Sequence, residues 1–209
     1  AAIPEVFITA HEALLHLGRL RRGDAVLVHA AAGGVGSAVV QLARATGATV
    51  FATTAASKRG AVLQLGADRV IDYRNEDFAE IVAAYTEKRG VDVVIDFVGV
   101  PYFQKNIASL ANGGRLVQVG LLGGGGEIKV ELAQILYRHL QIIGTVMKSR
   151  TQAEKQAMTR RFREHWLDHF NAGTSLKPII DSTFPLMHAP DAHRRMESAE
   201  NVGKIVLTT

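Results

Sequence analysis

A glycine-rich turn between an apolar strand and a helix is the part of this sequence best suited to chemistry. Residues 24–30 (DAVLVHA) have the pattern of a short buried strand, and residues 35–46 have helical spacing. The turn fits the dinucleotide fingerprint G-x-G-x-x-G as Ala31-x-Gly33-x-x-Gly36, with alanine in the first glycine position. Gly33 would let the backbone approach a pyrophosphate, and Gly36 would let the helix pack closely on the strand. We therefore expect a dinucleotide site, with a purely structural turn as the alternative.

The end of the next predicted strand indicates which dinucleotide fits. In NAD-selective sheets, an acidic residue about 20 residues beyond the glycines receives the ribose 2′-hydroxyl. Residues 53–59 (TTAASKR) contain no carboxylate. A 2′-phosphate is well bound by a hydroxyl and one or two cations, which Ser57, Lys58 and Arg59 would supply beside Thr54. We therefore expect NADP(H); the alternative is that these cations face solvent at the start of a helix.

Apolar runs alternate with helix-length segments through the first 150 residues. Strands are predicted at residues 24–30, 49–54, 69–72, 91–98, 115–120 and 140–146, and helices at residues 35–46, 76–88, 102–110 and 131–137, with a short helix ending at Gly66. Continuous Val/Ile runs between helices are typical of a parallel sheet that is covered on both faces. The predicted fold is α/β, a doubly wound parallel Rossmann sheet with strand order 3-2-1-4-5-6.

The residues after 150 follow a different pattern. They predict a long helix over residues 151–171, an extended segment over 176–184, a helix over 190–198 and a strand over 203–208. We therefore divide the chain into a cofactor-binding Rossmann domain with an N-terminal crossover helix, residues 1–150, and a C-terminal helix and strand segment, residues 151–209.

Composition and charge exclude several classes of protein. The 209 residues are 47% hydrophobic, contain no cysteine and carry a formal net charge of +4. The basic residues are scattered and aromatic residues make up only 6%, so we do not expect nucleic-acid binding. No apolar run approaches the roughly 20 residues of a membrane span, and the N-terminus lacks a charged signal region. We expect a cytoplasmic protein.

One histidine pair has the spacing of metal ligands. His165 and His169 stand four residues apart on the long predicted helix and would share a metal with Glu164 or Asp168. No third ligand is evident, so we expect no metal site. No Ser/His/Asp set has the spacing of a catalytic triad, and we assign no catalytic acid or base.

Several motifs together carry a family resemblance. They are residues 23–24, 28–36, 65–68, 71–74, 91–94, 113–115 and 201–206. With these motifs the chain resembles the zinc-free medium-chain dehydrogenases/reductases, specifically the zeta-crystallin-like NADPH:quinone oxidoreductases. The resemblance covers essentially the whole chain.

The resemblance implies hydride transfer from NADPH to a quinone or to an activated C=C bond, as in an enone, by a homodimer. Members of this family carry a GroES-like catalytic domain ahead of this region, and residues 1–6 (AAIPEV) resemble the crossover from it. The chain would then be a fragment with weak activity alone, and residues 151–209 would pack on the missing domain. Two alternatives are an enoyl reductase module of a polyketide or fatty-acid synthase, and a non-catalytic NADPH-binding protein of the crystallin or RNA-binding kind.

The resemblance also implies cofactor contacts. At the glycine turn they are Ala32, Gly33, Gly34, Val35 and Gly36; at the nicotinamide end they are Val98, Gly99, Gly120, Leu121 and Leu122. Thr9 would lie beside the nicotinamide or be a helix N-cap, and Asn201 would reach the cofactor or only form a turn. Residues 123–126 (GGGG) would cover the nicotinamide or form a loose surface loop.

At the phosphate end, the resemblance implies a lysine a few residues after Ser57. The helix there is about two residues shorter than in the family, which leaves open whether Lys58 or Arg59 has that role. Tyr73, with Arg74, would close the phosphate pocket from the end of the next strand.

Overall fold

Six parallel strands form the central sheet of the computed structural model, which describes residues 2–171 and 176–209. They are β1 (Ala25–Val28), β2 (Thr49–Thr54), β3 (Arg69–Asp72), β4 (Val91–Asp96), β5 (Leu110–Gln118) and β6 (Gln141–Gly144). Their order is β3-β2-β1-β4-β5-β6, which confirms the predicted doubly wound Rossmann sheet. Strand β5 begins five positions before the predicted start at residue 115, directly after the preceding helix.

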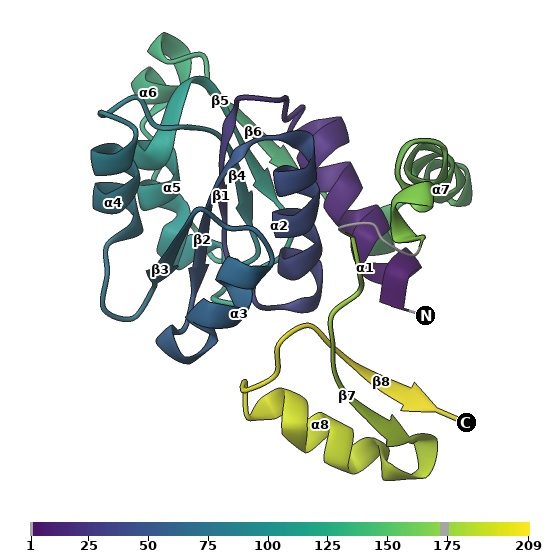
Figure 1. Cartoon of the computed structure of the whole chain (residues 1–209). Helices are drawn as coiled ribbons and strands as arrows, with labels where there is room; N and C mark the ends of the chain where they lie inside the picture. Colours follow the sequence, from purple (N-terminus) through teal and green to yellow (C-terminus); the bar gives the residue numbers. More distant parts are fainter. Residues whose placement is uncertain (1, 172–175) are drawn as a thin grey trace.

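Helices cover both faces of the sheet (Figure 1). On one face lie α1 (Ala2–His11), α2 (Gly34–Thr46), α3 (Arg59–Gln64) and α7 (Gln152–Trp166); on the other lie α4 (Phe78–Tyr85), α5 (Phe103–Ser109) and α6 (Leu132–Tyr137). Shorter helical turns are η1 (Glu12–Leu17, a π-helix), η2 (Ala56–Lys58), η3 (Val100–Tyr102), η4 (Met147–Ser149), η5 (Leu167–Phe170) and η6 (Leu186–His188). Ala1, the first residue of the expected crossover segment, lies outside the described residues.

The central strands are apolar throughout because they are buried on both faces. In β1, Val26 and Val28 belong to the apolar cluster under α1 and α2, whereas Leu27 belongs to the cluster under α4 and α5. All three side chains are fully buried. This two-sided burial explains why the strand reads as a continuous apolar run.

Helix α7 packs on α1 beside the sheet. The ring of Phe7 lies 6.4 Å from that of Phe162, and both residues belong to the same buried cluster. The buried carboxylate of Glu12 pairs with Arg161 at 2.6 Å and with Arg150 at 3.5 Å. The predicted helix over residues 151–171 is therefore α7 continued by η5.

The last part of the chain forms a small separate lobe (Figure 1). It consists of β7 (Ile180–Pro185), α8 (Ala189–Glu197) and β8 (Lys204–Thr208), with the two strands parallel. The division of the chain at residue 150 stays a prediction, since α7 shares its apolar cluster with α1.

Two helical glycines give a matched test of the contact between α2 and β1. A Cβ on Gly36 would lie 2.3 Å from the Ala30 carbonyl oxygen, whereas a Cβ on Gly60 meets nothing within 4 Å. Gly36→Ala should lower the free energy of unfolding by about 1–3 kcal/mol through overpacking. Gly60→Ala should raise it by up to about 1 kcal/mol through helix propensity. Urea titration measures both; a Gly36→Ala variant as stable as the unmodified chain would contradict the close contact.

Candidate functional site

The glycine turn lies at the carboxyl end of β1, in the middle of the sheet (Figure 1). Ala30 has a left-handed backbone with φ of +47°, and the Gly33 N–H donates to the Ala30 carbonyl at 2.9 Å. Helix α2 begins at Gly34, and the first N–H groups of a helix have no acceptor within it. The turn therefore directs N–H donors and the positive end of the helix dipole to the edge of the sheet, an arrangement that binds phosphate.

The segment before β8 lies against this turn. The Gly203 N–H donates to the Ala32 carbonyl at 2.8 Å, and Gly203 forms an isolated bridge with Gly33. Lys204 pairs with Glu5 of α1 at 2.8 Å. Gly203 and Lys204 were not predicted from the sequence to be neighbours of the turn. The one available signal was the glycine at 203, which adopts a left-handed backbone with φ of +83°.

Asn201 is brought to the end of β2 by the same segment. Its carbonyl oxygen accepts a hydrogen bond from Lys58 Nζ at 2.8 Å, and its side-chain amide donates to the Gly203 carbonyl at 3.2 Å. The side chain thus supports a local turn, while the main chain lies beside a predicted phosphate ligand. A contact between Asn201 and the cofactor stays a prediction.

Arg59 and Lys58 have different partners. Arg59 pairs with Glu76 at 2.6 Å, and Glu76 also accepts from the Asp72 N–H at 2.6 Å. Lys58 has no carboxylate within 4.0 Å among the residues that the structure describes. Partial burial is the main cause that lowers the pKa of Lys58 from its ordinary value; the positive charges of Arg195 and Arg74 act in the same direction, and the negative charges of Asp181 and Glu200 oppose them. Arg59 therefore has a direct ion pair, with a carboxylate that Arg69 shares at 3.4 Å, whereas Lys58 has none within the described part of the chain.

The other predicted phosphate ligands lie at the neighbouring strand ends. Thr54 is buried at the end of β2, Ser57 is exposed in η2, and Tyr73 is exposed directly after β3. The Tyr73 N–H donates to the Thr54 carbonyl at 3.3 Å. The Arg74 guanidinium lies 5.7 Å from the centre of the Tyr73 ring and donates to its hydroxyl at 3.4 Å. Residues from β2 and β3 thus border one exposed, basic edge.

The loops after β4 and β5 contact each other at the same edge of the sheet. The Leu122 N–H donates to the Phe97 carbonyl at 2.9 Å, and Gly120 lies against Phe97. Gly99 has φ of +92°, and a Cβ there would lie 2.5 Å from the Gly124 carbonyl oxygen. The structure therefore brings Val98 and Gly99 together with residues 120–122, as the predicted nicotinamide end requires.

The glycine run at residues 123–126 is partly ordered by this contact. The Gly123 N–H donates to the Val98 carbonyl at 2.8 Å, and the Val100 N–H donates to the Gly124 carbonyl at 3.2 Å. Gly123 and Gly124 are thus hydrogen-bonded to the loop after β4, while residues 123–126 are all exposed, as in the alternative of a surface loop. That the run covers a nicotinamide stays a prediction.

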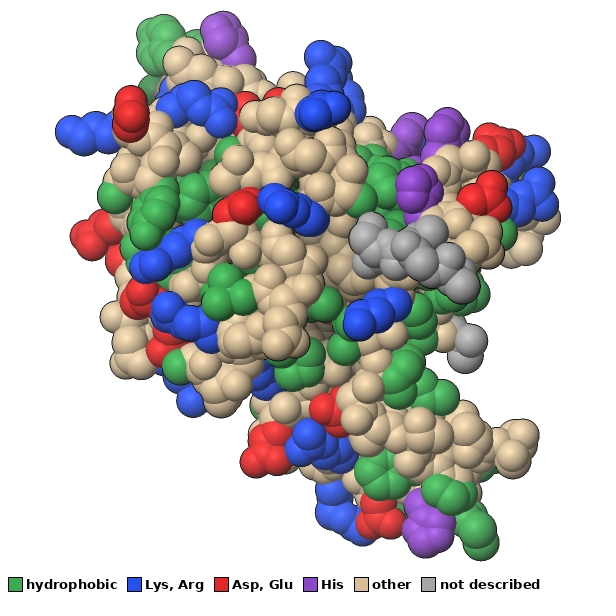
Figure 2. Space-filling model, viewed as in Figure 1, with side chains coloured by type: hydrophobic (Ala, Val, Ile, Leu, Met, Phe, Trp, Pro, Cys, Tyr) green, Lys and Arg blue, Asp and Glu red, His purple; other side chains and the backbone are tan. Residues whose placement is uncertain are grey.

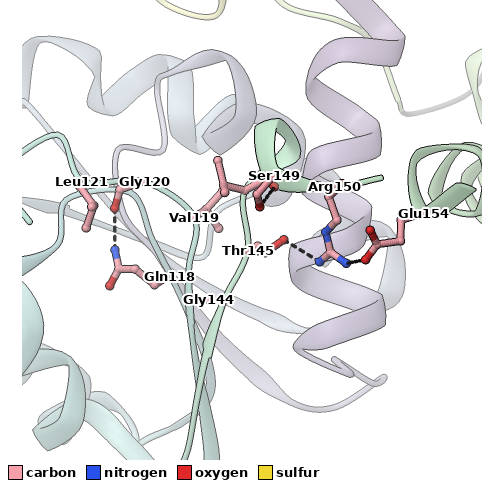
Figure 3. A pocket seen from close by; sticks show the side chains of 10 residues that line it. Gln118, Val119, Gly120, Leu121, Gly144, Thr145, Ser149, Arg150 and Glu154 are labelled. Atoms are coloured by element: carbon pink, nitrogen blue, oxygen red, sulfur yellow. Dashed lines mark hydrogen bonds and ion pairs between the residues drawn. The ribbon is translucent and has the colours of Figure 1, made fainter. Parts of the chain in front are cut away.

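A cavity of about 670 Å³ opens beside these loops, at the carboxyl ends of β5 and β6. Figure 3 shows Arg150 directed toward Thr145 and Glu154 in its wall, at distances of 3.0 and 3.3 Å. Gln118, also in the wall, donates to the Gly120 carbonyl at 2.7 Å. Gln118, Thr145 and Arg150 were not predicted as site residues. Gln118 and Thr145 lie in the last half of predicted strands, which was the available signal, whereas Arg150 follows η4 and had none.

Thr9 and Val35 meet in a smaller cavity of about 230 Å³ next to the first. Phe97 and Val119, from the ends of β4 and β5, line the same cavity. The N-cap alternative for Thr9 is wrong, because α1 begins at Ala2 and the Thr9 hydroxyl donates to the Glu5 carbonyl one turn earlier at 3.1 Å. Thr9 therefore lies where the predicted nicotinamide end would be.

Metal and nucleic-acid binding receive no support from the side chains. Within residues 2–171 and 176–209, no group of three or more His, Cys, Asp or Glu side chains is placed to hold a metal ion. On the face in Figure 2, Lys and Arg are spread out and mixed with Asp and Glu. In the same described part of the chain, no helix is both long and apolar enough to span a bilayer.

Comparison with known families and proteins gives consistent matches. The family model described as zinc-binding dehydrogenase matches residues 34–164. The synaptic vesicle membrane protein VAT-1 homolog of Danio rerio is 36% identical over 100% of this chain and 46% of its own length. The quinone oxidoreductase of Homo sapiens is 31% identical over 99% of this chain and 61% of its own length. The chain thus spans about half to three-fifths of these relatives.

Solved structures show the same fold at similar identity. The CurK enoyl reductase superimposes with a TM-score of 0.82 and 31% identity, covering 100% of this chain and 62% of that one. A mycobacterial protein in complex with NADPH superimposes with a TM-score of 0.81 and 31% identity, covering 97% of this chain and 61% of that one.

Proposed function

The chain belongs to the zinc-binding dehydrogenase family, as an NAD(P)-binding domain of an oxidoreductase, and we propose from this that it binds NADPH for hydride transfer to quinones or enones. The observation that carries the proposal is the glycine turn, where α2 directs its N-terminus at the sheet edge between β2 and β4. We assign the chain to the zinc-free, zeta-crystallin-like members on its sequence motifs, and the similarity to the quinone oxidoreductase of Homo sapiens supports this assignment.

The preference for NADPH over NADH follows from charge. No carboxylate follows β2, whose end carries Ser57 and Lys58. Lys58 makes no direct ion pair among the described residues and donates to the neutral carbonyl of Asn201, although Asp181 and Glu200 lie near enough to affect its pKa. Arg74 also lies near enough to affect the pKa of Lys58 and would add a second positive charge. The mycobacterial relative in complex with NADPH supports the same choice. We therefore assign the 2′-phosphate to Ser57, Lys58 and Tyr73, with Arg74 rather than Arg59 as the second cation.

The two halves of the sheet divide the cofactor. The β1-β2-β3 half would hold the adenosine and its phosphate, and the β1-β4-β5 half would hold the nicotinamide ring. NADPH supplies the hydride when it is bound. The loops with Gly99 and Gly120 would then orient the ring toward the cavity of about 670 Å³, whose wall includes Arg150. An acceptor molecule would lie in that cavity.

An enoyl reductase is the second candidate. The CurK enoyl reductase aligns with the whole chain, and its TM-score of 0.82 is similar to the 0.81 of the mycobacterial protein in complex with NADPH. Both candidates use the same cofactor end of the sheet, so only the acceptor distinguishes them.

Lys58→Met should raise the Kd for NADPH at least about tenfold, since a charge-assisted hydrogen bond contributes about 1.5–3 kcal/mol. The Kd for NADH should stay within about twofold, because NADH lacks the 2′-phosphate. The matched control is the double variant Arg59→Met, Glu76→Gln, which removes both charges of one ion pair and should leave NADPH binding near that of the unmodified chain. Cofactor fluorescence measures both. Equal affinity of the unmodified chain for NADPH and NADH would refute the assignment.

The complete gene product that carries this chain should oxidise NADPH faster with a benzoquinone or an enone than with an α,β-unsaturated acyl thioester. Absorbance at the nicotinamide band measures the rate. Gly33→Asp should reduce all rates at least about tenfold, because it puts negative charge beside the pyrophosphate. A Cβ on Gly33 would lie 3.2 Å from the Ala30 carbonyl oxygen, a close contact, so thermal melting of the variant is the control for its fold. A faster rate with the thioester would favour the enoyl reductase.

We also propose a homodimer that forms through the β6 edge. Strand β6 ends the sheet, and exposed apolar side chains lie on it and on α6: Leu132, Leu136, Tyr137 and Ile142. An edge with unpaired backbone groups and apolar neighbours is suited to two-fold pairing with a second copy. Ile142→Lys should shift the chain from dimer to monomer in light scattering at micromolar concentration. A monomeric unmodified chain would count against this interface.

A further inference from the structure

Four buried polar side chains form a continuous hydrogen-bonded chain beneath the cofactor edge. Thr53 is in β2, His29 follows β1, Asn106 is in α5 and Asp96 ends β4; none is more than 1% exposed. His29 Nδ1 lies 2.9 Å from Thr53 Oγ1, and His29 Nε2 lies 2.7 Å from Asn106 Oδ1. Asn106 Nδ2 lies 3.0 Å from Asp96 Oδ2. This hydrogen-bonded network therefore joins the two halves of the sheet.

The direction of each hydrogen bond follows from the chemistry of the groups. A carboxylate accepts only, so Asn106 must donate its amide to Asp96 and accept from His29 Nε2–H with its oxygen. His29 Nδ1 then accepts from the Thr53 hydroxyl. His29 is neutral in this arrangement, in agreement with the effect of burial, which lowers its pKa from the ordinary value. The rings of Phe78 and Tyr102 lie within 4.8 Å of the imidazole and exclude water.

Asp96 links this network to the backbone of the loop after β4. Its carboxylate accepts from the Val98 N–H at 2.6 Å and from the Gly99 N–H at 3.2 Å. Val98 in turn accepts from Gly123, and Gly124 accepts from Val100. One carboxylate therefore holds both loops at the predicted nicotinamide end.

We propose that Asn106 and His29 are positioning residues for the nicotinamide half of the cofactor. They do not reach the cofactor edge; they hold Asp96, which fixes the backbone of residues 98–99. An apolar side chain in place of Asp96 would leave the Val98 and Gly99 N–H groups without this acceptor, so the satisfied polar network selects one geometry of the loops. The inference rests on the proposed function, in which NADPH lies across both halves of the sheet.

The experiment compares NADPH with 2′,5′-ADP, which has the adenosine half alone. Asn106→Leu keeps the branching of the side chain, with a somewhat larger volume, and removes both hydrogen bonds of the amide. It should raise the Kd for NADPH at least tenfold and leave the Kd for 2′,5′-ADP within twofold, both measured by calorimetry. The matched control is Ser109→Ala in the same helix. Ser109 is 2% exposed, and its hydroxyl donates to the Lys105 carbonyl of the same helix at 2.8 Å, outside the proposed network. It should change neither Kd.

Asp96→Asn provides a second variant of nearly identical shape, in which an amide N–H would face a loop N–H in at least one position. It should show the same selective loss of NADPH affinity. Equal losses for both ligands, no loss for either, or failure of both variants to melt cooperatively would assign the network to stability alone and overturn the proposal. An unmodified chain that binds neither ligand would instead refute the proposed function.

Discussion

The missing side chain at Gly36 is the constraint from which the geometry of the site follows. A Cβ at this position would lie 2.3 Å from the Ala30 carbonyl oxygen, so α2 can lie at this distance from the end of β1 only with glycine. Ala30 adopts a left-handed backbone conformation, with φ of +47°, in this turn. Strand β1 is central, and its neighbours are β2 and β4. A ligand anchored at the helix N-terminus is therefore within reach of loops from both halves of the sheet.

The two adjacent cations, Lys58 and Arg59, differ in their ion pairs. Glu76 accepts from Arg59 and from the Asp72 backbone, which holds that carboxylate in place, and the Arg59–Glu76 pair has no net charge to offer a phosphate. Lys58 instead donates to a neutral carbonyl and makes no direct ion pair with any described residue, so the nearby carboxylates of Asp181 and Glu200 act on its charge only from a greater distance. Because a 2′-phosphate is attracted by net charge rather than by the number of basic residues, position in the ion-pair network matters more than residue type.

Features that depend on residues close in the sequence could be predicted, and features that depend on contacts between residues far apart in the sequence could not. The central strands, which are buried on both faces, are continuous apolar runs, so their positions could be predicted from the sequence. Their order followed from the alternation of strands and helices that is typical of a doubly wound sheet. The choice between Lys58 and Arg59 could not, because it depends on Glu76, 17 residues beyond Arg59, and on Asn201 from the end of the chain. The N-cap alternative for Thr9 was wrong because Thr9 lies inside α1, which already includes Ala2, seven residues earlier. The position of Arg150 in the cavity wall also has a distant cause, because Arg150 pairs with Glu12 near the start of the chain.

The two ends of the site are thus held by different means. At the glycine turn, a helix packed at contact distance has essentially one position, and the backbone alone defines the phosphate site. The loop after β5 contains four consecutive glycines at residues 123–126, and such a segment has many accessible conformations. Selecting one of them requires strong, directional contacts from a rigid element. Asp96, buried at the end of a central strand and supported by Asn106 and His29, supplies such contacts to the loop after β4, against which the glycines are hydrogen-bonded. A dinucleotide site of this kind therefore needs glycine where the helix meets the strand, and buried polar side chains where flexible loops must take one shape.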